Sequence, residues 1–144
     1  MRRTLLAMAI GTLAIGGIAL AQQHDHGIPE VKVLSRVDIT EKLDGKKAKA
    51  TTVEVTLGPG EASAPHRHPG PAFGYVMEGE YEWAIEDNPT KLLKVGDTFY
   101  EPTGCLHRVS KNPSKEGKTR ILAVVLHPAD VHDIVIPEKD KKQE

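Results

Sequence analysis

Residues 60–79 read GEASAPHRHPGPAFGYVMEG, and residues 96–112 read GDTFYEPTGCLHRVSKN. The first segment contains a His-x-His pair in a sequence typical of an extended strand. Alternate side chains of a strand share a face, so His66 and His68 point the same way while Arg67 points the other way. Two neutral imidazoles placed in this manner can bind one metal ion.

The second segment contributes a third histidine. His107 follows Pro102 and Gly104, which are turn residues that can direct the end of a strand toward the first pair. The sequence therefore predicts that three histidines converge from two strands on one metal site: His66, His68 and His107.

The two segments resemble the two sequence motifs of the cupins, a family of small β-barrels or jelly rolls built from two antiparallel sheets. The first motif reads Gly, five residues, His-x-His, three or four residues, Glu, six residues, Gly, and is matched by Gly60, His66, His68 and Gly79. The second motif reads Gly, five residues, Pro-x-Gly, two residues, His, and is matched in full by Gly96, Pro102, Gly104 and His107. The resemblance covers residues 51–128 and implies an all-β fold.

The chain departs from the first motif at its glutamate. Ala72 occupies that position, or Phe73 under the longer spacing, and neither side chain can bind a metal. Asn112 also lies one residue later than the asparagine usual in the second motif. Between Phe73 and Glu86, odd positions hold Phe73, Tyr75, Met77, Tyr81, Trp83 and Ile85, which predicts that the glutamates at even positions face solvent. A bulge at Gly79 would reverse this register, so Glu78 stays open as a replacement ligand.

The three-histidine set indicates the class of metal. Imidazole suits iron, zinc, copper and nickel. Within the cupins, a three-histidine face is similar to that of the thiol dioxygenases and the diketone-cleaving dioxygenase, and this resemblance implies Fe²⁺, with Mn²⁺, Zn²⁺, Ni²⁺ or Cu²⁺ as alternatives. Without a carboxylate the ion would keep its full double charge, which predicts a preference for an anionic chelating substrate.

Six residues near the motifs are candidates for a substrate pocket: Ala72, Tyr75, Met77, Trp83, Tyr100 and Cys105. Ala72 would leave room for the substrate, and each of the others has a second interpretation as an ordinary core residue. The lone Cys105 has three: a small buried hydrophobe, a thiol that lines the pocket, or a metal ligand.

These observations predict a metal-dependent enzyme of dioxygenase type that acts on a small anionic molecule. Two other classes stay open, because one barrel supports many functions. One is a module that binds a small molecule or sugar without catalysis, and the other is a metal-dependent lyase or isomerase. Metal content separates the binding module from the enzymes.

Length and charge narrow the class of partner. The chain has 144 residues, which suits a single domain, and carries 19 basic and 20 acidic residues. It has no basic field that would favour nucleic acid. The resemblance to cupins implies a homodimer. The apolar run at residues 121–126 agrees with it, because that run predicts a strand covered on both faces, one by the core and the other by a second subunit.

The first 21 residues read as a secretory signal peptide. Arg2 and Arg3 precede an apolar run, and the small residues Ala19 and Ala21 lie just before a cleavage position that follows Ala21. Removal of residues 1–21 leaves 17 basic and 20 acidic residues, a net charge of −3. An uncleaved membrane anchor is the alternative, and the Ala-x-Ala site favours cleavage without stable membrane insertion. The predicted location is the periplasm or the exterior of a bacterium.

The rest of the chain divides around the barrel. Residues 22–50 are expected to form an N-terminal arm with His24 and His26, followed by an edge strand and a hairpin turn at Asp44-Gly45. Residues 51–128 form the barrel, and residues 129–144 form a C-terminal tail, disordered from Pro137 onward. His127 is expected to be a partly exposed histidine at the end of a strand.

Overall fold

Residues 29–138 are described by the computed structural model, and within this range the chain forms ten β-strands and no helix. No segment in this range therefore has the length and hydropathy of a helical membrane span. The leader, the arm with His24 and His26 and the last six residues lie outside the described residues. The strands are β1 (Glu30–Leu43), β2 (Lys46–Leu57), β3 (His66–Arg67), β4 (Ala72–Glu78), β5 (Glu80–Ile85), β6 (Lys91–Lys94), β7 (Thr98–Glu101), β8 (His107–Lys111), β9 (Thr119–Pro128) and β10 (Ile136–Pro137).

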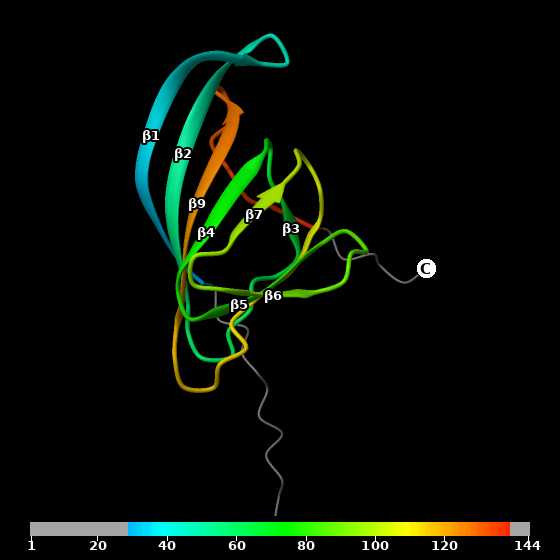
Figure 1. Cartoon of the computed structure of the whole chain (residues 1–144). Coiled ribbons are helices and arrows are strands. Elements are labelled where there is room, and N and C mark those ends of the chain that lie inside the picture. Colours follow the sequence, from blue (N-terminus) through cyan, green and yellow to red (C-terminus); the bar gives the residue numbers. More distant parts are fainter. Residues whose placement is uncertain (1–28, 139–144) are drawn as a thin grey trace, which may run out of the picture.

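The strands form two five-stranded sheets. One has the order β1-β2-β9-β4-β7 and the other the order β10-β3-β8-β5-β6, and every recorded strand pair is antiparallel. Figure 1 shows the first sheet as a long curved layer, with the shorter strands of the second sheet facing part of it. This architecture confirms the predicted all-β jelly roll of two antiparallel sheets.

The predicted edge strand and hairpin are both present. β1 pairs only with β2 among the described strands, and their connection is Asp44-Gly45. Both turn residues have positive φ, 51° and 76°, as a two-residue hairpin turn whose twist matches the flanking strands requires. The hairpin extends beyond the rest of the first sheet (Figure 1).

The core lies between the two sheets. On β2, Val53 and Leu57 point into this core and are buried, while the residues between them are partly exposed. A cluster of five buried side chains joins the two sheets: Leu57, Val76, Tyr81, Trp83 and Ile121. Burial of one such side chain stabilises the fold by about 1.5–3 kcal/mol.

The structure corrects the register that the sequence predicted for β4. Phe73 and Tyr75 are 49% and 43% exposed, whereas Ala72 and Val76 are buried. The alternation reverses because the chain leaves the first sheet after β4 and enters the second sheet at β5. Gly79 makes this corner with φ of 77°, and a Cβ there would lie 2.5 Å from the backbone oxygen of Lys118.

Glu78 lies beside this corner. The β4–β9 pairing shifts register between Val76 and Glu78, so the suspected irregularity exists. Its carboxylate is half exposed and forms ion pairs with Lys118 and Arg120, at 3.7 Å and 3.5 Å. It does not replace the missing ligand among the described side chains.

Two expectations for the C-terminal part were wrong. His127 is 2% exposed, and its Nε2 is hydrogen-bonded to Thr51 Oγ1 at 2.8 Å, because β9 is an interior strand of its sheet. Residues 136–137 form β10, which pairs with β3 and places Ile136 opposite Arg67. Glu138 follows and forms an ion pair with Arg67 at 2.8 Å, so ordered structure extends past Pro137.

Asn112 connects the loops at one end of the barrel. It is fully buried, and its Nδ2 donates hydrogen bonds to the backbone oxygens of Leu57, Gly58 and Gly117. Its backbone NH donates to the oxygen of Glu61. These bonds fix the chain that leads out of β8 against the chain that leads into β3, and so hold the two histidine segments together.

Candidate metal centre

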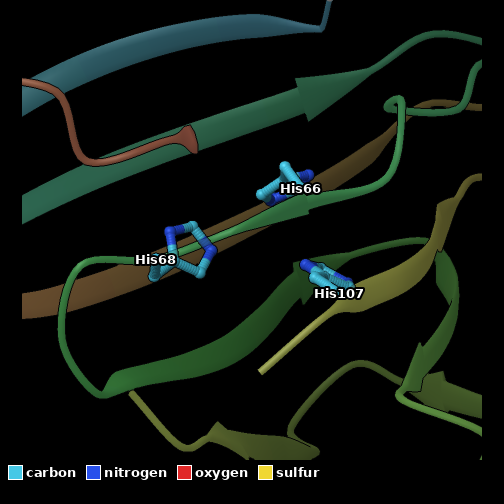
Figure 2. Close-up of side chains that lie close together, drawn as sticks. All are labelled: His66, His68 and His107. Carbon is cyan, nitrogen blue, oxygen red and sulfur yellow. The ribbon is translucent and has the colours of Figure 1, made fainter. Parts of the chain in front are cut away.

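The three predicted histidines lie together between the sheets. His66 is on β3, His68 follows β3, and His107 begins β8, where it is the cross-strand partner of His66. One nitrogen from each of the three rings lies within 4.8 Å of the others. Figure 2 shows the three imidazoles gathered in one space, two from one segment and the third from a neighbouring strand.

Each histidine is oriented through a nitrogen that faces away from this cluster. Nδ1 of His66 is hydrogen-bonded to the oxygen of Ala64 at 2.9 Å, and Nδ1 of His68 to the oxygen of Ile134 at 2.6 Å. For both rings the carbonyl acceptor requires Nδ1–H, which leaves Nε2 with a free lone pair. Such partners hold the rings of metal-binding histidines in place.

His107 is oriented by a chain of hydroxyl groups. The Tyr81 hydroxyl donates to Ser110 Oγ at 2.8 Å, and Ser110 donates to Ser63 Oγ at 3.3 Å. Since the hydrogen of the Tyr81 hydroxyl points to Ser110, the Tyr81 oxygen can only accept from His107 Nε2, 3.2 Å away. His107 Nδ1 then carries the free lone pair.

A buried carboxylate that the sequence reasoning missed lies beside these rings. Glu101, at the end of β7, is 1% exposed. Its Oε1 accepts a hydrogen bond from Trp83 Nε1 at 3.0 Å and lies 3.1 Å from His107 Nδ1. Its Oε2 lies 3.4 Å from His68 Nε2. The signal was the alternation of β7, which places Phe99 and Glu101 on the face opposite Tyr100.

Burial sets the protonation of the cluster. It lowers the pKa of His66 and His68, and together with the charges of those two histidines it lowers the pKa of His107 to about 3. The rings are therefore neutral at pH 7, which is the form that binds metal. Burial raises the pKa of Glu101, because a carboxylate with little access to water is costly unless a cation compensates it.

The donors fit a divalent transition metal. Glu101 Oε2 and His107 Nδ1 are buried and have no hydrogen-bond partner among the described residues. A buried polar atom without a partner costs about 1–3 kcal/mol, and a bound cation removes that cost. Three imidazole nitrogens are the donors preferred by iron, zinc, copper and nickel. His66, His68 and His107 are the residues that would hold the ion.

A largely apolar cavity of about 300 Å³ adjoins the histidines. Val53, Ile121 and Val125 line it from the first sheet, and Ile134 and Val135 from the segment that precedes β10. No lysine or arginine of the described chain lines it. The cavity is large enough for a small organic molecule and provides no fixed positive charge except that of a bound metal.

Of the six pocket candidates, only Ala72 lines this cavity. Tyr75 and Tyr100 are exposed on the outer face of the first sheet, on the strand faces opposite Ala72 and Glu101. Trp83 belongs to the core cluster and reaches the site only through its hydrogen bond to Glu101. Met77 is partly buried next to Val76 and does not reach the cavity.

Cys105 lies in the turn between β7 and β8. It is partly buried, does not line the cavity and is not part of the metal cluster. Burial and the nearby carboxylates of Glu101 and Glu86 raise the pKa of its thiol to about 11. The thiol is therefore protonated at neutral pH, which favours the interpretation as a small hydrophobe over those as a pocket thiol or metal ligand.

Comparison with known proteins agrees with this architecture. The family model described as Cupin domain matches residues 53–125, about half of the chain, so the protein belongs to the cupin family. A gentisate 1,2-dioxygenase of Streptomyces sp. is 37% identical over 51 residues, which is 35% of this chain and 14% of the dioxygenase. The chain therefore spans only a small part of that relative.

Solved structures show the same fold. The DMSP lyase DddQ of Ruegeria pomeroyi superposes with a TM-score of 0.57 at 19% identity, over 81% of this chain and 54% of the lyase. A double-stranded β-helix protein of Klebsiella pneumoniae gives 0.57 at 23% identity, over 78% and 87%. An oxalate oxidase gives 0.52 at 22% identity, over 61% and 45%. The cupin fold predicted from the two motifs is thus confirmed.

Proposed function

We propose that this cupin is a metal-dependent oxidoreductase of dioxygenase type, which binds Fe²⁺ at His66, His68 and His107 and acts on a small molecule in the adjoining cavity. The observation that carries the proposal is the position of these three neutral imidazoles beside a largely apolar cavity. The similarity of 51 residues to a gentisate 1,2-dioxygenase supports the oxygenase class.

Different side chains would bind the ion, orient its ligands and contact the substrate. A bound ferrous ion would supply oxygen activation, and the three imidazoles on one side leave positions for other ligands. The hydrogen bonds that the rings donate to the carbonyl oxygens of Ala64 and Ile134 and to the Tyr81 hydroxyl oxygen hold them in fixed tautomers. The valines and isoleucines of the cavity wall exclude water from a bound substrate and contact its apolar part.

The structure changes the class of substrate that we propose. An anionic molecule was expected because the centre lacked a carboxylate, but the Glu101 carboxylate lies beside His68 and His107. With this negative charge present and an apolar wall, the proposed substrate is a small, mostly apolar molecule with one metal-chelating group.

Metal analysis of the native protein, purified without an affinity tag, tests the proposal. We expect close to one equivalent of iron after anaerobic reconstitution, and oxygen uptake when a panel of dihydroxybenzoates, small thiols and β-diketones is added. The variant His24→Ala/His26→Ala serves as the control for adventitious binding by the N-terminal arm. A protein that takes up no transition metal would instead be a metal-free binding module.

Two further expectations belong to this proposal. The signal peptide predicted from residues 1–21 supports a role in the periplasm or outside the cell. The outer face of the first sheet carries the exposed aromatic side chains Phe73, Tyr75 and Tyr100, which supports a homodimer through this face.

A further inference from the structure

Glu101 lies beside Ala72, the position where the first cupin motif would put its glutamate. Ala72 and Glu101 are directly paired residues of β4 and β7, so their side chains lie on the same face of the sheet, about 5 Å apart at Cβ. Both are almost fully buried. The short side chain of Ala72 leaves a space that the longer side chain of Glu101 can enter from the neighbouring strand.

The carboxylate is held in a fixed orientation. Trp83 Nε1 donates to Oε1, which leaves Oε2 as the oxygen without a protein hydrogen bond. Oε2 lies 3.4 Å from His68 Nε2, whose lone pair is free because Nδ1 is engaged by Ile134. An acceptor oxygen and an acceptor nitrogen at this distance repel each other unless a cation or a proton lies between them.

The same conflict occurs at the other oxygen. Oε1 lies 3.1 Å from His107 Nδ1, and this nitrogen has no hydrogen-bond partner. The hydroxyl chain through Tyr81 and Ser110 assigns the proton of His107 to Nε2. The free lone pairs of two histidines and a buried carboxylate therefore face one small volume.

No basic side chain compensates this carboxylate. The only ion-pair partners recorded for Glu101 in the described chain are His68 and His107. No lysine or arginine of residues 29–138 lines the adjoining cavity. A divalent cation satisfies the carboxylate and the nitrogen lone pairs together.

We propose that Glu101 is the fourth protein ligand of the metal, supplied by β7 in place of the glutamate that Ala72 lacks. This inference rests on the proposed metal site and goes beyond it, because it makes the centre a three-histidine, one-carboxylate site. One unit of the ion's charge is thereby neutralised by the protein, and anions other than the chelating substrate are bound less well.

Titration of the full-length protein with Co²⁺ tests this ligand without relying on activity. We expect Glu101→Gln to weaken Co²⁺ affinity by more than about 100-fold, because loss of a residue that only supports a ligand costs at most about that much. The visible spectrum of the bound Co²⁺ should also change. Glutamine keeps the shape and still accepts from Trp83. The matched control is Glu82→Gln, since Glu82 pairs with Lys111 away from the centre and should have no effect.

A second variant separates a ligand from a residue that only orients His107. In the double variant Ala72→Glu/Glu101→Gln, the carboxylate returns from the paired position on β4, and we expect most of the Co²⁺ affinity to return. The single variant Ala72→Glu is measured beside it. If the new carboxylate raises the Co²⁺ affinity as much with Glu101 present as in the Glu101→Gln background, the two carboxylates do not share one position on the ion and Glu101 only positions His107. That result would overturn the proposal.

The remaining outcomes distinguish failure of the Glu101 ligand from failure of the metal site. If wild-type protein binds Co²⁺ and Glu101→Gln binds it equally well with the same spectrum, Glu101 is not a ligand although the three-histidine site stands. If wild-type protein binds no Co²⁺, the proposed function itself fails. Should the variants not fold, infrared difference spectra of the wild type on addition of Zn²⁺ decide, since a carboxylate ligand shifts its stretching bands and an unchanged carboxylate region overturns the proposal.

Discussion

The two faces of β4 and β7 are built from neighbouring residues, but one faces the interior of the barrel and the other is exposed. The inner face carries Ala72, Gly74, Val76, Phe99 and Glu101, which border the candidate metal centre or the hydrophobic interior. The outer face carries Phe73, Tyr75 and Tyr100, and the rings of Phe73 and Tyr100 are 5.2 Å apart.

The difference shows that a hollow interior needs small residues. Three large aromatic side chains, Phe73, Tyr75 and Tyr100, face outward, whereas the inner face has the small residues Ala72 and Gly74 among its members. The space left inside is what makes room for three histidines, a carboxylate and a cavity. Substitutions on the inner face should therefore change metal affinity and the free energy of unfolding, and substitutions on the outer face should change the association of subunits.

The largest effect is expected from the histidine that faces both Glu101 and His66. His107→Ala should lower Co²⁺ affinity by more than about 100-fold, because it removes a ligand and not merely a supporting group. The barrel should stay folded, since its core cluster does not include His107. Calorimetric titration and circular dichroism measure the two results. Unchanged metal affinity would show that His107 is not a ligand of the metal.

Gly74 tests the packing of the inner face. A Cβ at this position would lie 2.0 Å from Cζ of Phe99, whose ring also packs against Tyr81 and Trp83. Gly74→Ala should therefore lower the free energy of unfolding by about 1–3 kcal/mol. Gly117→Ala is the control, because the nearest atom there is 3.6 Å away. Equal denaturation midpoints for the two variants would contradict this packing.

The metal-free protein should lose stability as the pH falls. The pKa of His107 is lowered from 6.5 to about 3 in the folded chain, so below pH 6.5 the unfolded chain binds a proton that the folded chain does not. Each such group removes up to about 1.4 kcal/mol per pH unit. Chemical denaturation in EDTA between pH 7 and 5 measures this slope. The raised pKa of Glu101 has the opposite effect, since it favours the folded chain as the pH falls. The contribution of His107 is therefore measured by comparing the wild type with His107→Ala, whose loss of stability per pH unit should be smaller.

The smallest effect on stability is expected on the outer face. Tyr75→Ser should change the free energy of unfolding by no more than about 0.5 kcal/mol, because Tyr75 is 43% exposed. The double variant Phe73→Ser/Tyr75→Ser should nevertheless convert the proposed dimer into monomers. Light scattering after size-exclusion chromatography measures the mass. A wild-type monomer, or a dimer that survives both substitutions, would exclude this face as the interface.

The sequence by itself determined the fold class and the three histidines. Alternation, the Asp44-Gly45 turn and the spacing within the two motifs are local properties, and a strand pattern places His66 and His68 on one face wherever the strand goes. The second motif then identified His107. All of these were found because the relevant residues are close together in the chain or belong to a motif of fixed spacing.

Only the tertiary structure decided which face of β4 looks inward and which carboxylate lies at the centre. Alternation assigns residues to two faces but does not say which one is covered, and the corner at Gly79 reverses the register. Glu101 is 29 positions from Ala72 in the sequence and becomes its neighbour through the pairing of β4 with β7. The return of β10 over the site, with Ile134 bonded to His68, is likewise a contact between distant parts of the chain. Such pairings depend on how the whole sheet is assembled, which no local pattern contains.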